Sequence, residues 1–322
     1  MNPDVIAGAA EPPEVSVVIP LRDERESLEE LHRRLAAVFQ SLGRRAEYLF
    51  VDDGSTDGSF EYLAALHARS PAVRVTRFRR SFGKAAALAE GFSRARGAII
   101  ITIDADLQDE PEEVPHLIEM LESREYDLVS GWKRVRHDPL SKRLPSRLFN
   151  RVSGALTGVR IHDMNCGLKA YRREVVSEVR VYGGLYRFLP ALAHWQGFRV
   201  GEIEVRHHPR LHGRTKYGWS RLLDGFLDLL TVILTTRYTR RPLHFFGLAG
   251  FAVAAIGGVT GLYLVSLWLR YRNLQNHHPM LIFAVLAILL GVQLISTGLL
   301  AELIVSSRAG GAGDYSVKER LG

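Results

Sequence analysis

Short runs of β-branched and aliphatic residues alternate with amphipathic segments between about residues 15 and 205. This alternation is typical of β-α units that feed a mostly parallel sheet. We therefore expect an α/β domain of the Rossmann-like type over residues 14–217, preceded by a disordered lead at residues 1–13. The apolar runs predict strands at Val15–Ile19, Tyr48–Val51, Val73–Arg77, Ile99–Ile103 and Asp127–Ser130.

Two long apolar segments dominate the last third of the chain. Leu243–Leu269 contains no Asp, Glu, Lys or Arg, and Pro279–Val305 contains only Glu302. Each segment exceeds the roughly 20 residues that a helix needs to cross the hydrocarbon core. We predict transmembrane helices at 243–269 and 279–305, with a loop at 270–278 and a tail at 306–322. Buried helices of a soluble core are disfavoured, because neither segment has a polar face.

The juxtamembrane segment at residues 218–242 has an amphipathic pattern. From Trp219 to Thr236 apolar side chains recur every three or four residues, whereas Asp224 and Asp228 fall on the opposite face. Two aspartates argue against a transmembrane position, so we expect a helix that lies in the plane of the lipid headgroups. The alternative is an ordinary surface helix packed on the α/β domain.

The chain is basic, with a formal net charge of +7 and a pI near 9.6. Such charge suits nucleic acid, anionic lipid or a phosphorylated substrate. Basic residues gather at 133–147, at 206–216 and at 237–241, the last directly before the first apolar span. The position of the last cluster favours contact with a membrane surface. Binding of nucleic acid is disfavoured because no aromatic-basic motif accompanies the charge. A lone cysteine, Cys166, excludes a disulfide within the chain, which suits a cytosolic domain.

The basic residues that flank the two spans indicate their orientation. More of them lie on the side of the α/β domain than in the intervening loop: Arg237, Arg240, Arg241, Arg308, Lys318 and Arg320 against Arg270 and Arg272. Positive charge concentrates on the cytoplasmic side of membrane proteins. The N-terminus also lacks the basic start and apolar run of a signal peptide. We expect a multi-pass protein of the inner (plasma) membrane whose α/β domain and tail are cytoplasmic.

Polar or glycine-rich loops follow four of the predicted strands, at Pro20–Glu24, Asp52–Asp57, Ser81–Lys84 and Asp104–Asp109. In open α/β sheets, ligands bind outside the carboxyl ends of the strands. We therefore expect these four loops to converge on one crevice.

Asp104 and Asp106 form a pair of carboxylates at the end of the strand Ile99–Ile103. Strand alternation places both on one side of the chain. Mg²⁺ and Mn²⁺ favour oxygen ligands and commonly share them with substrate phosphates. The spacing predicts a metal-diphosphate site; the alternative is a solvated turn that caps the helix beginning at Pro111.

Seven stretches form a specific combination that covers nearly the whole chain: VSVVIPLRDERESL, FVDDGSTDGS, RRSFGKAAAL, DADLQDEPE, DMNCGLKAYRR, HGRTKYGWSRLLDGFLDLL and RRPLHFFGLAG. In this combination the sequence resembles the family-2 glycosyltransferases of GT-A fold. More narrowly, it resembles the dolichyl-phosphate mannose synthases and bacterial polyprenyl-phosphate glycosyltransferases. Two departures are visible: Asp23 stands where the family usually has Asn, and Cys166 stands where a small hydroxyl residue is common.

The resemblance implies a transferase that moves one sugar from a UDP- or GDP-linked donor to undecaprenyl or dolichyl phosphate, with Mg²⁺ or Mn²⁺ as cofactor. It implies three groups of site residues. The residues expected to bind the nucleotide are Pro20, Glu24, Asp53 and Lys84. Those expected to bind the metal and diphosphate are Asp104, Asp106 and Gln108. Those expected to bind the diphosphate or the lipid phosphate are Arg134, Arg147, Arg210 and Lys216. For Arg134 and Arg147 a solvated basic face is the alternative.

A lipid phosphate is already anionic at neutral pH, so it can attack the anomeric carbon without losing a proton to a base. Catalysis then depends on positioning both substrates and on cations that stabilise the departing nucleoside diphosphate. We expect metal-dependent transfer that inverts the anomeric configuration. Asp163 is expected to orient the acceptor or to pair with an arginine, not to act as a general base.

Two other functions are compatible with parts of the sequence. A processive polysaccharide synthase usually carries a Gln-x-x-Arg-Trp motif and more spans, and this chain has neither. A catalytically silent nucleotide-sugar-binding subunit would not need the Asp104/Asp106 pair. Small residues at Gly258–Gly261 indicate close helix packing and hence a homo-oligomer. No residue identifies the sugar.

Overall fold

The computed structural model describes residues 12–134, 161–208 except 180 and 182, 242–272 and 277–308, with a few residues between 153 and 159 and residue 231. The chain divides into two compact units, Met1–Leu230 and Thr231–Gly322, which are described separately. The predicted amphipathic helix at Trp219–Thr236 lies almost wholly outside the described residues.

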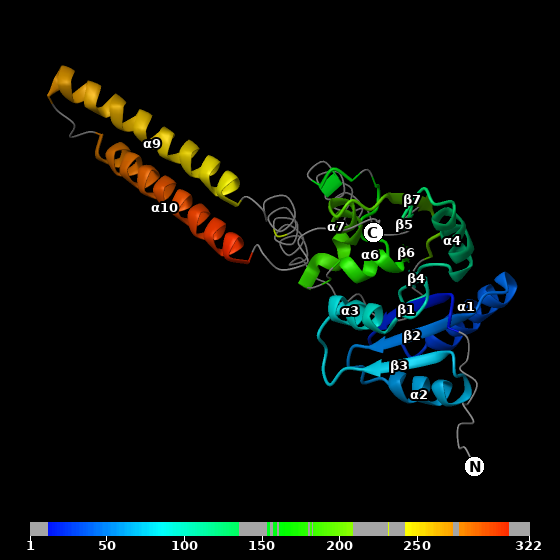
Figure 1. The fold of residues 1–322 in the computed structure, drawn as a ribbon. Helices are drawn as coiled ribbons and strands as arrows, with labels where there is room; N and C mark the ends of the chain where they lie inside the picture. The colour runs from blue at the N-terminus through cyan, green and yellow to red at the C-terminus, as the bar shows by residue number, and fades with distance from the viewer. Residues whose placement is uncertain are drawn as a thin grey trace, which may run out of the picture. The chain divides into compact units, whose positions relative to one another are not determined.

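The first unit is built on a mixed sheet. Over the described residues the sheet has seven strands in the order β3-β2-β1-β4-β6-β5-β7 (Figure 1). Their bounds are β1 Val15–Leu21, β2 Ala46–Asp52, β3 Val73–Arg77, β4 Ile99–Thr102, β5 Leu128–Trp132, β6 Lys169–Arg172 and β7 Val200–Glu204. Neighbouring strands are parallel except where β6 runs antiparallel to β4 and β5. The expected α/β fold with a mostly parallel sheet is confirmed, and β1–β5 are the five predicted strands.

Helices cover both faces of this sheet. On each face, a cluster of apolar side chains lies between the helices and the sheet. The first cluster includes side chains of α1 (Leu28–Leu42), α2 (Ser59–Arg69) and α4 (Val114–Glu122). The second includes side chains of α3 (Lys84–Arg94), α6 (Arg173–Glu178) and α7 (Leu189–Trp195). Two 3₁₀ turns, η1 (Pro111–Glu113) and η2 (Gly183–Phe188), precede α4 and α7.

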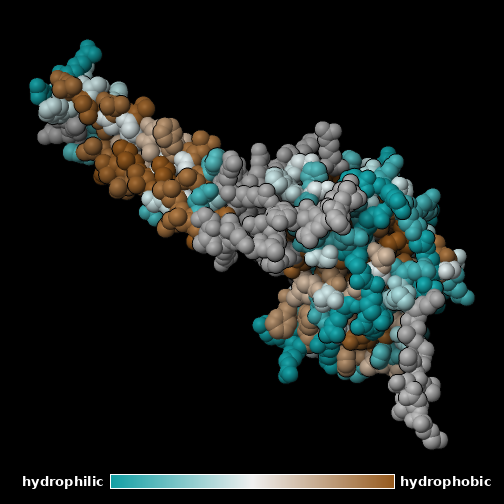
Figure 2. Space-filling view, in the orientation of Figure 1, coloured by the Kyte–Doolittle hydropathy of each residue, from teal (hydrophilic) through white to brown (hydrophobic). Residues whose placement is uncertain are grey.

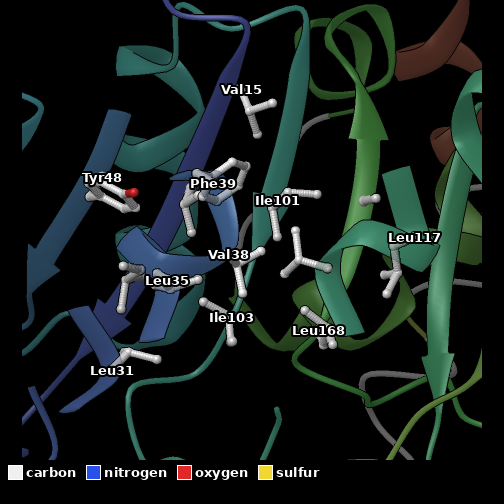
Figure 3. Close-up of a cluster of buried hydrophobic side chains, with 14 of the residues drawn as sticks. Val15, Leu31, Leu35, Val38, Phe39, Tyr48, Ile101, Ile103, Leu117 and Leu168 are labelled. Carbon is white, nitrogen blue, oxygen red and sulfur yellow. The ribbon is translucent and has the colours of Figure 1, made fainter. Parts of the chain in front are cut away.

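Strand alternation assigns each side chain to one of the two clusters. In β4, Ile99 and Ile101 belong to the first cluster and Ile100 to the second, as the two-residue period of a strand requires. Figure 3 shows Ile101 and Ile103 in one cluster with Leu35 of α1 and Leu117 of α4. Because β1, β2 and β4 are parallel neighbours, the loops that follow them begin at the same edge of the sheet.

The second unit contains two long apolar helices, α9 (Pro242–Tyr271) and α10 (His278–Arg308), which lie side by side (Figure 1). Both are long and apolar enough to cross a membrane, and Figure 2 shows apolar side chains over their outer surface. Glycines bring the helices together: a Cβ atom on Gly250 would lie 2.6 Å from the carbonyl oxygen of Gly291. Such close backbone approach is typical of helix pairs in membranes.

Glu302, the one acidic residue in the apolar segments, lies within this helix pair. Its carboxylate accepts a hydrogen bond from the backbone N–H of Leu243, 3.2 Å away. The first N–H groups of a helix have no partner within the helix and carry partial positive charge, so a carboxylate is favourable there. Glu302 therefore joins the end of α10 to the beginning of α9.

Candidate active site

Hydrogen bonds connect the loops that follow β1 and β2. The backbone N–H of Asp23 donates to Ser55 Oγ, and the backbone N–H of Thr56 donates to Asp23 Oδ1, each at 2.9 Å. Asp23 has a φ of 52°, in the left-handed region that Asn and Asp tolerate best among residues with a side chain. Asp23, which stands where the resembling family usually has Asn, therefore keeps both the backbone conformation and the acceptor oxygen that an Asn would supply.

Asp53 connects the loop after β2 to the loop after β3. Its carboxylate accepts hydrogen bonds from Ser81 Oγ at 2.6 Å and from the backbone N–H groups of Phe82 and Gly83 at 2.6 and 3.0 Å. The side chain is buried, and both of its oxygens bind the loop that leads into α3. The structure thus gives Asp53 a loop-anchoring position, and its assignment to the nucleotide stays a prediction. Of the other predicted nucleotide ligands, Pro20 lies within β1, and the Glu24 N–H donates to Ser59 Oγ at 3.3 Å.

Lys84 connects the third loop to the fourth. It is the first residue of α3, and its ammonium group donates a hydrogen bond to Asp104 Oδ1. Burial opposes the charge on both groups, but their mutual attraction outweighs it, so the pKa of Lys84 is raised. The pKa of Asp104 is lowered by Lys84, with Lys133 and Lys169 contributing, although burial alone would raise it. Hydrogen bonds therefore connect the four predicted loops in series, with an ionised Asp104 in the fourth, and a single crevice shared by all four stays a prediction.

The loop after β4 bends sharply at Leu107. This residue has a φ of 56°, a strained conformation for a bulky side chain, and its own burial in the first cluster holds it there. Asp106 is buried, and its Oδ1 accepts a hydrogen bond from the Gln108 N–H at 3.2 Å. The carbonyl oxygen of Gln108 in turn accepts a hydrogen bond from the N–H of His208 at 2.9 Å. The bend thus fixes Asp106 between β4 and the chain that follows β7.

A buried ion pair connects the same loop to the residue that follows β5. Lys133 Nζ is 2.6 Å from Asp109 Oδ1, and the Asp109 side chain is fully buried. Burial opposes the charge of Lys133, but Asp109 outweighs it and the pKa of Lys133 is raised. The sequence placed Lys133 in the basic cluster at 133–147, and its pairing with Asp109 was missed because nothing local in the sequence connects the two.

Gly167 and Lys169 complete the surroundings of Asp104. A Cβ atom on Gly167 would lie 2.5 Å from Asp104 Oδ2, so only glycine fits beside this carboxylate. Together with Lys84, Asn165, Tyr186 and Arg187 they line a cleft next to Asp104. The side chain of Lys169 is buried and donates a hydrogen bond to the carbonyl oxygen of Cys166. Burial lowers the pKa of Lys169, and sequence reasoning did not select either residue.

Asp163 lies in a turn that β7 positions. Glu202 of β7 accepts hydrogen bonds from the backbone N–H groups of His162 and Asp163, each at 2.9 Å. Asp163 is buried, and its Oδ1 accepts a hydrogen bond from the Asn165 N–H at 3.2 Å. The carboxylate thus shapes the turn that leads to Gly167, a role that the sequence did not indicate.

Of the predicted phosphate-binding residues, the structure describes Arg134 alone. It follows β5, is exposed, and forms an ion pair with Glu204 of β7 at 3.3 Å. Arg147, Arg210 and Lys216 lie outside the described residues.

Asp104 and Asp106 suit a divalent cation that takes further ligands from substrate and water. Within the described part of the chain, no group of three or more His, Cys, Asp or Glu side chains could hold a metal. Mg²⁺ and Mn²⁺ in phosphoryl-binding sites are commonly held by one or two carboxylates, with phosphate oxygens and water as the other ligands. Gly167 leaves the space beside Asp104 Oδ2 that an added Cβ would fill. The residues therefore fit such a cation.

Comparisons with known proteins identify the family of this chain. A family model described as "Glycosyl transferase family 2" matches residues 16–180. Dodecaprenyl-phosphate galacturonate synthase of Rhizobium johnstonii is 40% identical over 90% of this chain and 87% of its own length. Undecaprenyl-phosphate 4-deoxy-4-formamido-L-arabinose transferase of Pseudomonas paraeruginosa is 41% identical over 90% of this chain and 84% of its own length.

Solved structures share the fold at lower identity. Glucosyl-3-phosphoglycerate synthase of Mycobacterium tuberculosis in complex with UDP superposes with a TM-score of 0.50 and 20% identity, over 70% of this chain and 80% of that one. Its complex with Mn²⁺ and UDP-glucose gives a TM-score of 0.51 and 20% identity, over 70% and 79%. At this identity the similarity establishes the fold alone.

Proposed function

The chain belongs to glycosyl transferase family 2, with a catalytic unit of GT-A fold, and we propose that it transfers one sugar from a nucleotide diphosphate sugar to a polyprenyl phosphate in the membrane. One observation carries this proposal. Two relatives of about 40% identity, one named as a dodecaprenyl-phosphate galacturonate synthase and the other as an undecaprenyl-phosphate 4-deoxy-4-formamido-L-arabinose transferase, match 90% of the chain. A match of that length must extend into α9 and α10, so it includes the apolar helices as well as the sugar-transferring unit.

The donor is proposed to bind along the edge formed by the four loops, with its nucleotide toward β1 and β2. Pro20, Glu24 and Asp53 are the proposed nucleotide residues, and Lys84 joins this region to Asp104. A divalent cation, Mg²⁺ or Mn²⁺, held by Asp104 and Asp106 would supply the charge that stabilises the diphosphate leaving group. Gln108, through its N–H to Asp106, keeps that carboxylate in place.

The acceptor phosphate is ionised at neutral pH, so no side chain has to remove a proton from it. The work of the protein is then to align the two substrates and to exclude water. Asp163, buried in its turn, fits a positioning role better than that of a base. Arg134, Arg147, Arg210 and Lys216 are the proposed contacts to the lipid phosphate and diphosphate.

A polyprenyl phosphate keeps its chain in the bilayer, and the two apolar helices are proposed to anchor the protein in that same bilayer. We propose that the protein is a multi-pass protein of the inner (plasma) membrane with its catalytic unit on the cytoplasmic face, where nucleotide sugars are available. The balance of basic residues around the two helices supports that orientation.

The test uses membranes that contain the full chain, incubated with a panel of labelled nucleotide sugars, polyprenyl phosphate and Mg²⁺ or Mn²⁺. We expect label from one donor to enter organic-extractable lipid, and membranes from cells without the protein serve as the control. Label in long water-soluble polymer would show a processive synthase. The absence of transfer from every donor would favour a silent binding subunit.

A further inference from the structure

Lys169 is a buried cation without a carboxylate partner in the described part of the chain. The residue is 4% exposed, and the partner of its ammonium group is an uncharged oxygen, the carbonyl of Cys166. The other two lysines near Asp104 are paired: Lys84 with Asp104 itself, and Lys133 with Asp109. A buried charge without a counter-ion is costly, and an ammonium group has further donors to offer.

Basic side chains outnumber carboxylates in the lining of the cleft that contains Lys169. Its lining includes Lys84, Lys169 and Arg187 against a single carboxylate, that of Asp104, which is already bound to Lys84. Arg187 of η2 also lines the cleft, and its Nε donates a hydrogen bond to the Tyr186 hydroxyl at 3.3 Å. Asn165 adds an uncharged polar group. Such a lining suits an oxyanion, which could accept hydrogen bonds from Lys169 and Arg187 together.

The position of the cleft indicates which part of the substrates supplies this oxyanion. A divalent cation at Asp104 and Asp106 would already offset the charge of the diphosphate. The candidate acceptor residue Arg134 follows β5 and does not line the cleft, whereas the cleft adjoins Asp104 at the end of β4. The group that follows the diphosphate in a donor is the sugar.

We infer that Lys169 and Arg187 form a subsite for a carboxylate on the transferred sugar, so that the donor is a nucleotide-linked uronic acid. This inference rests on the proposed function, because it needs a sugar donor at Asp104. The acceptor phosphate is a second source of the same oxyanion chemistry, and the experiment separates the two.

The experiment uses purified full-length protein in lipid nanodiscs with polyprenyl phosphate, Mg²⁺ and Mn²⁺. Donors are compared in matched pairs that differ at C6 alone: UDP-galacturonate with UDP-galactose, and UDP-glucuronate with UDP-glucose. We expect the uronate of one pair to be transferred with a kcat/KM higher by about tenfold to a hundredfold, which corresponds to one or two charge-assisted hydrogen bonds.

Two variants test the residues. Lys169→Met keeps the length of the side chain without its charge, and replacement of a buried charge by an apolar group commonly preserves the fold. It should lower kcat/KM for the uronate about tenfold or more, leave the KM for polyprenyl phosphate unchanged, and be partly rescued in Lys169→Arg. Arg187→Met, at a half-buried position, gives an independent test if Lys169→Met unfolds. The control is Arg199→Gln. Arg199 is exposed and directly precedes β7, so it lies at the amino ends of the parallel strands, away from Asp104.

Each other outcome overturns the inference and leaves a distinct result. Equal or better transfer of the neutral sugars would exclude a carboxylate subsite while supporting the proposed function. A higher KM for polyprenyl phosphate in Lys169→Met, with the donor KM unchanged, would assign the subsite to the acceptor phosphate. Variants that match Arg199→Gln would show that neither residue binds an anion. Failure of every donor to label lipid would contradict the proposed function itself.

Discussion

The backbone of Gly167 lies so close to the carboxylate of Asp104 that a Cβ atom on residue 167 would fall 2.5 Å from Asp104 Oδ2. The glycine cannot easily retreat, because its carbonyl oxygen accepts a hydrogen bond from Thr102 Oγ1 at 2.9 Å inside the protein. A larger residue at 167 must therefore displace the carboxylate of Asp104.

Gly167→Ala is expected to lower kcat about a hundredfold while the protein stays folded, because a misplacement of about 1 Å in a catalytic site has an effect of that order. The measurement is lipid labelling together with thermal unfolding. Gly258→Ala is the control, since a Cβ on Gly258 in α9 meets no atom within 4 Å. Unchanged activity in Gly167→Ala would mean that the position of Asp104 is not critical.

Asp106→Ala is expected to abolish transfer and to leave the protein in the membrane. The carboxylate is buried at the bend of the loop after β4, and a proposed metal site with two protein ligands loses half of them. A chelator should abolish the activity of the unmodified protein, and added Mn²⁺ or Mg²⁺ should restore it. The control is Asp127→Asn. Asp127 directly precedes β5 and lies at the amino ends of the parallel strands, away from Asp106. Full activity of Asp106→Ala would refute the metal-site assignment.

The elements that local pattern determines were predicted from the sequence. β1 and β4 consist mainly of aliphatic and β-branched residues, which predict buried strands without reference to a distant partner. β6 (Lys169–Arg172) was missed, because its four residues begin and end with a cation. β7 (Val200–Glu204) was missed as well, because it carries two glutamates, Glu202 and Glu204. Both strands form because they pair with β5, which is distant in sequence.

The same distinction applies to the site. Asp104 and Asp106 form a local motif, and so the sequence was sufficient to select them. Gly167 and Lys169 matter because the antiparallel pairing of β6 with β4 brings this part of the chain beside Asp104. Single-sequence reasoning has no access to that contact; the one signal was their place in the motif DMNCGLKAYRR.

Stability at low pH should depend on Glu47. Its buried carboxylate accepts hydrogen bonds from Ser16 Oγ at 2.6 Å, from the Arg96 N–H at 2.8 Å and from Arg74 at 3.2 Å. Burial would raise the pKa of Glu47, but these hydrogen bonds outweigh it and lower the pKa. The contribution to stability is therefore fully present above the unfolded-state pKa of about 4.3 and is lost as the pH falls through the lower folded-state pKa.

Glu47→Gln should accordingly lower the free energy of unfolding by about 1.5–3 kcal/mol at neutral pH, the usual value of hydrogen bonds to a charged group. The difference between the two proteins should shrink as the pH falls below about 4. Denaturant unfolding of purified protein in detergent measures it. Glu30→Gln, which removes an exposed ion pair with Arg33, should have little effect. A difference that stays constant with pH would rule out the charge of Glu47 as its cause.

Asp53 can be tested as an anchor of the loop before α3. In Asp53→Asn the amide group would present N–H donors to a site that already contains the N–H groups of Phe82 and Gly83, and one of these would lose its acceptor. We expect unfolding to be easier by about 1–3 kcal/mol. We also expect a lower kcat, because the loop carries Lys84 to Asp104.

Ser81→Ala separates this anchoring role from direct nucleotide recognition. It removes one hydrogen bond to Asp53, 2.6 Å long, without changing the carboxylate. If Asp53 acts through the loop, Ser81→Ala should reproduce part of both defects, and free UDP should bind Asp53→Asn with nearly unchanged affinity. Calorimetric titration with UDP and thermal unfolding measure the two effects. A large loss of UDP affinity in Asp53→Asn at unchanged stability would instead assign the carboxylate to the nucleotide, because only a direct contact would weaken binding while the loop stays in place.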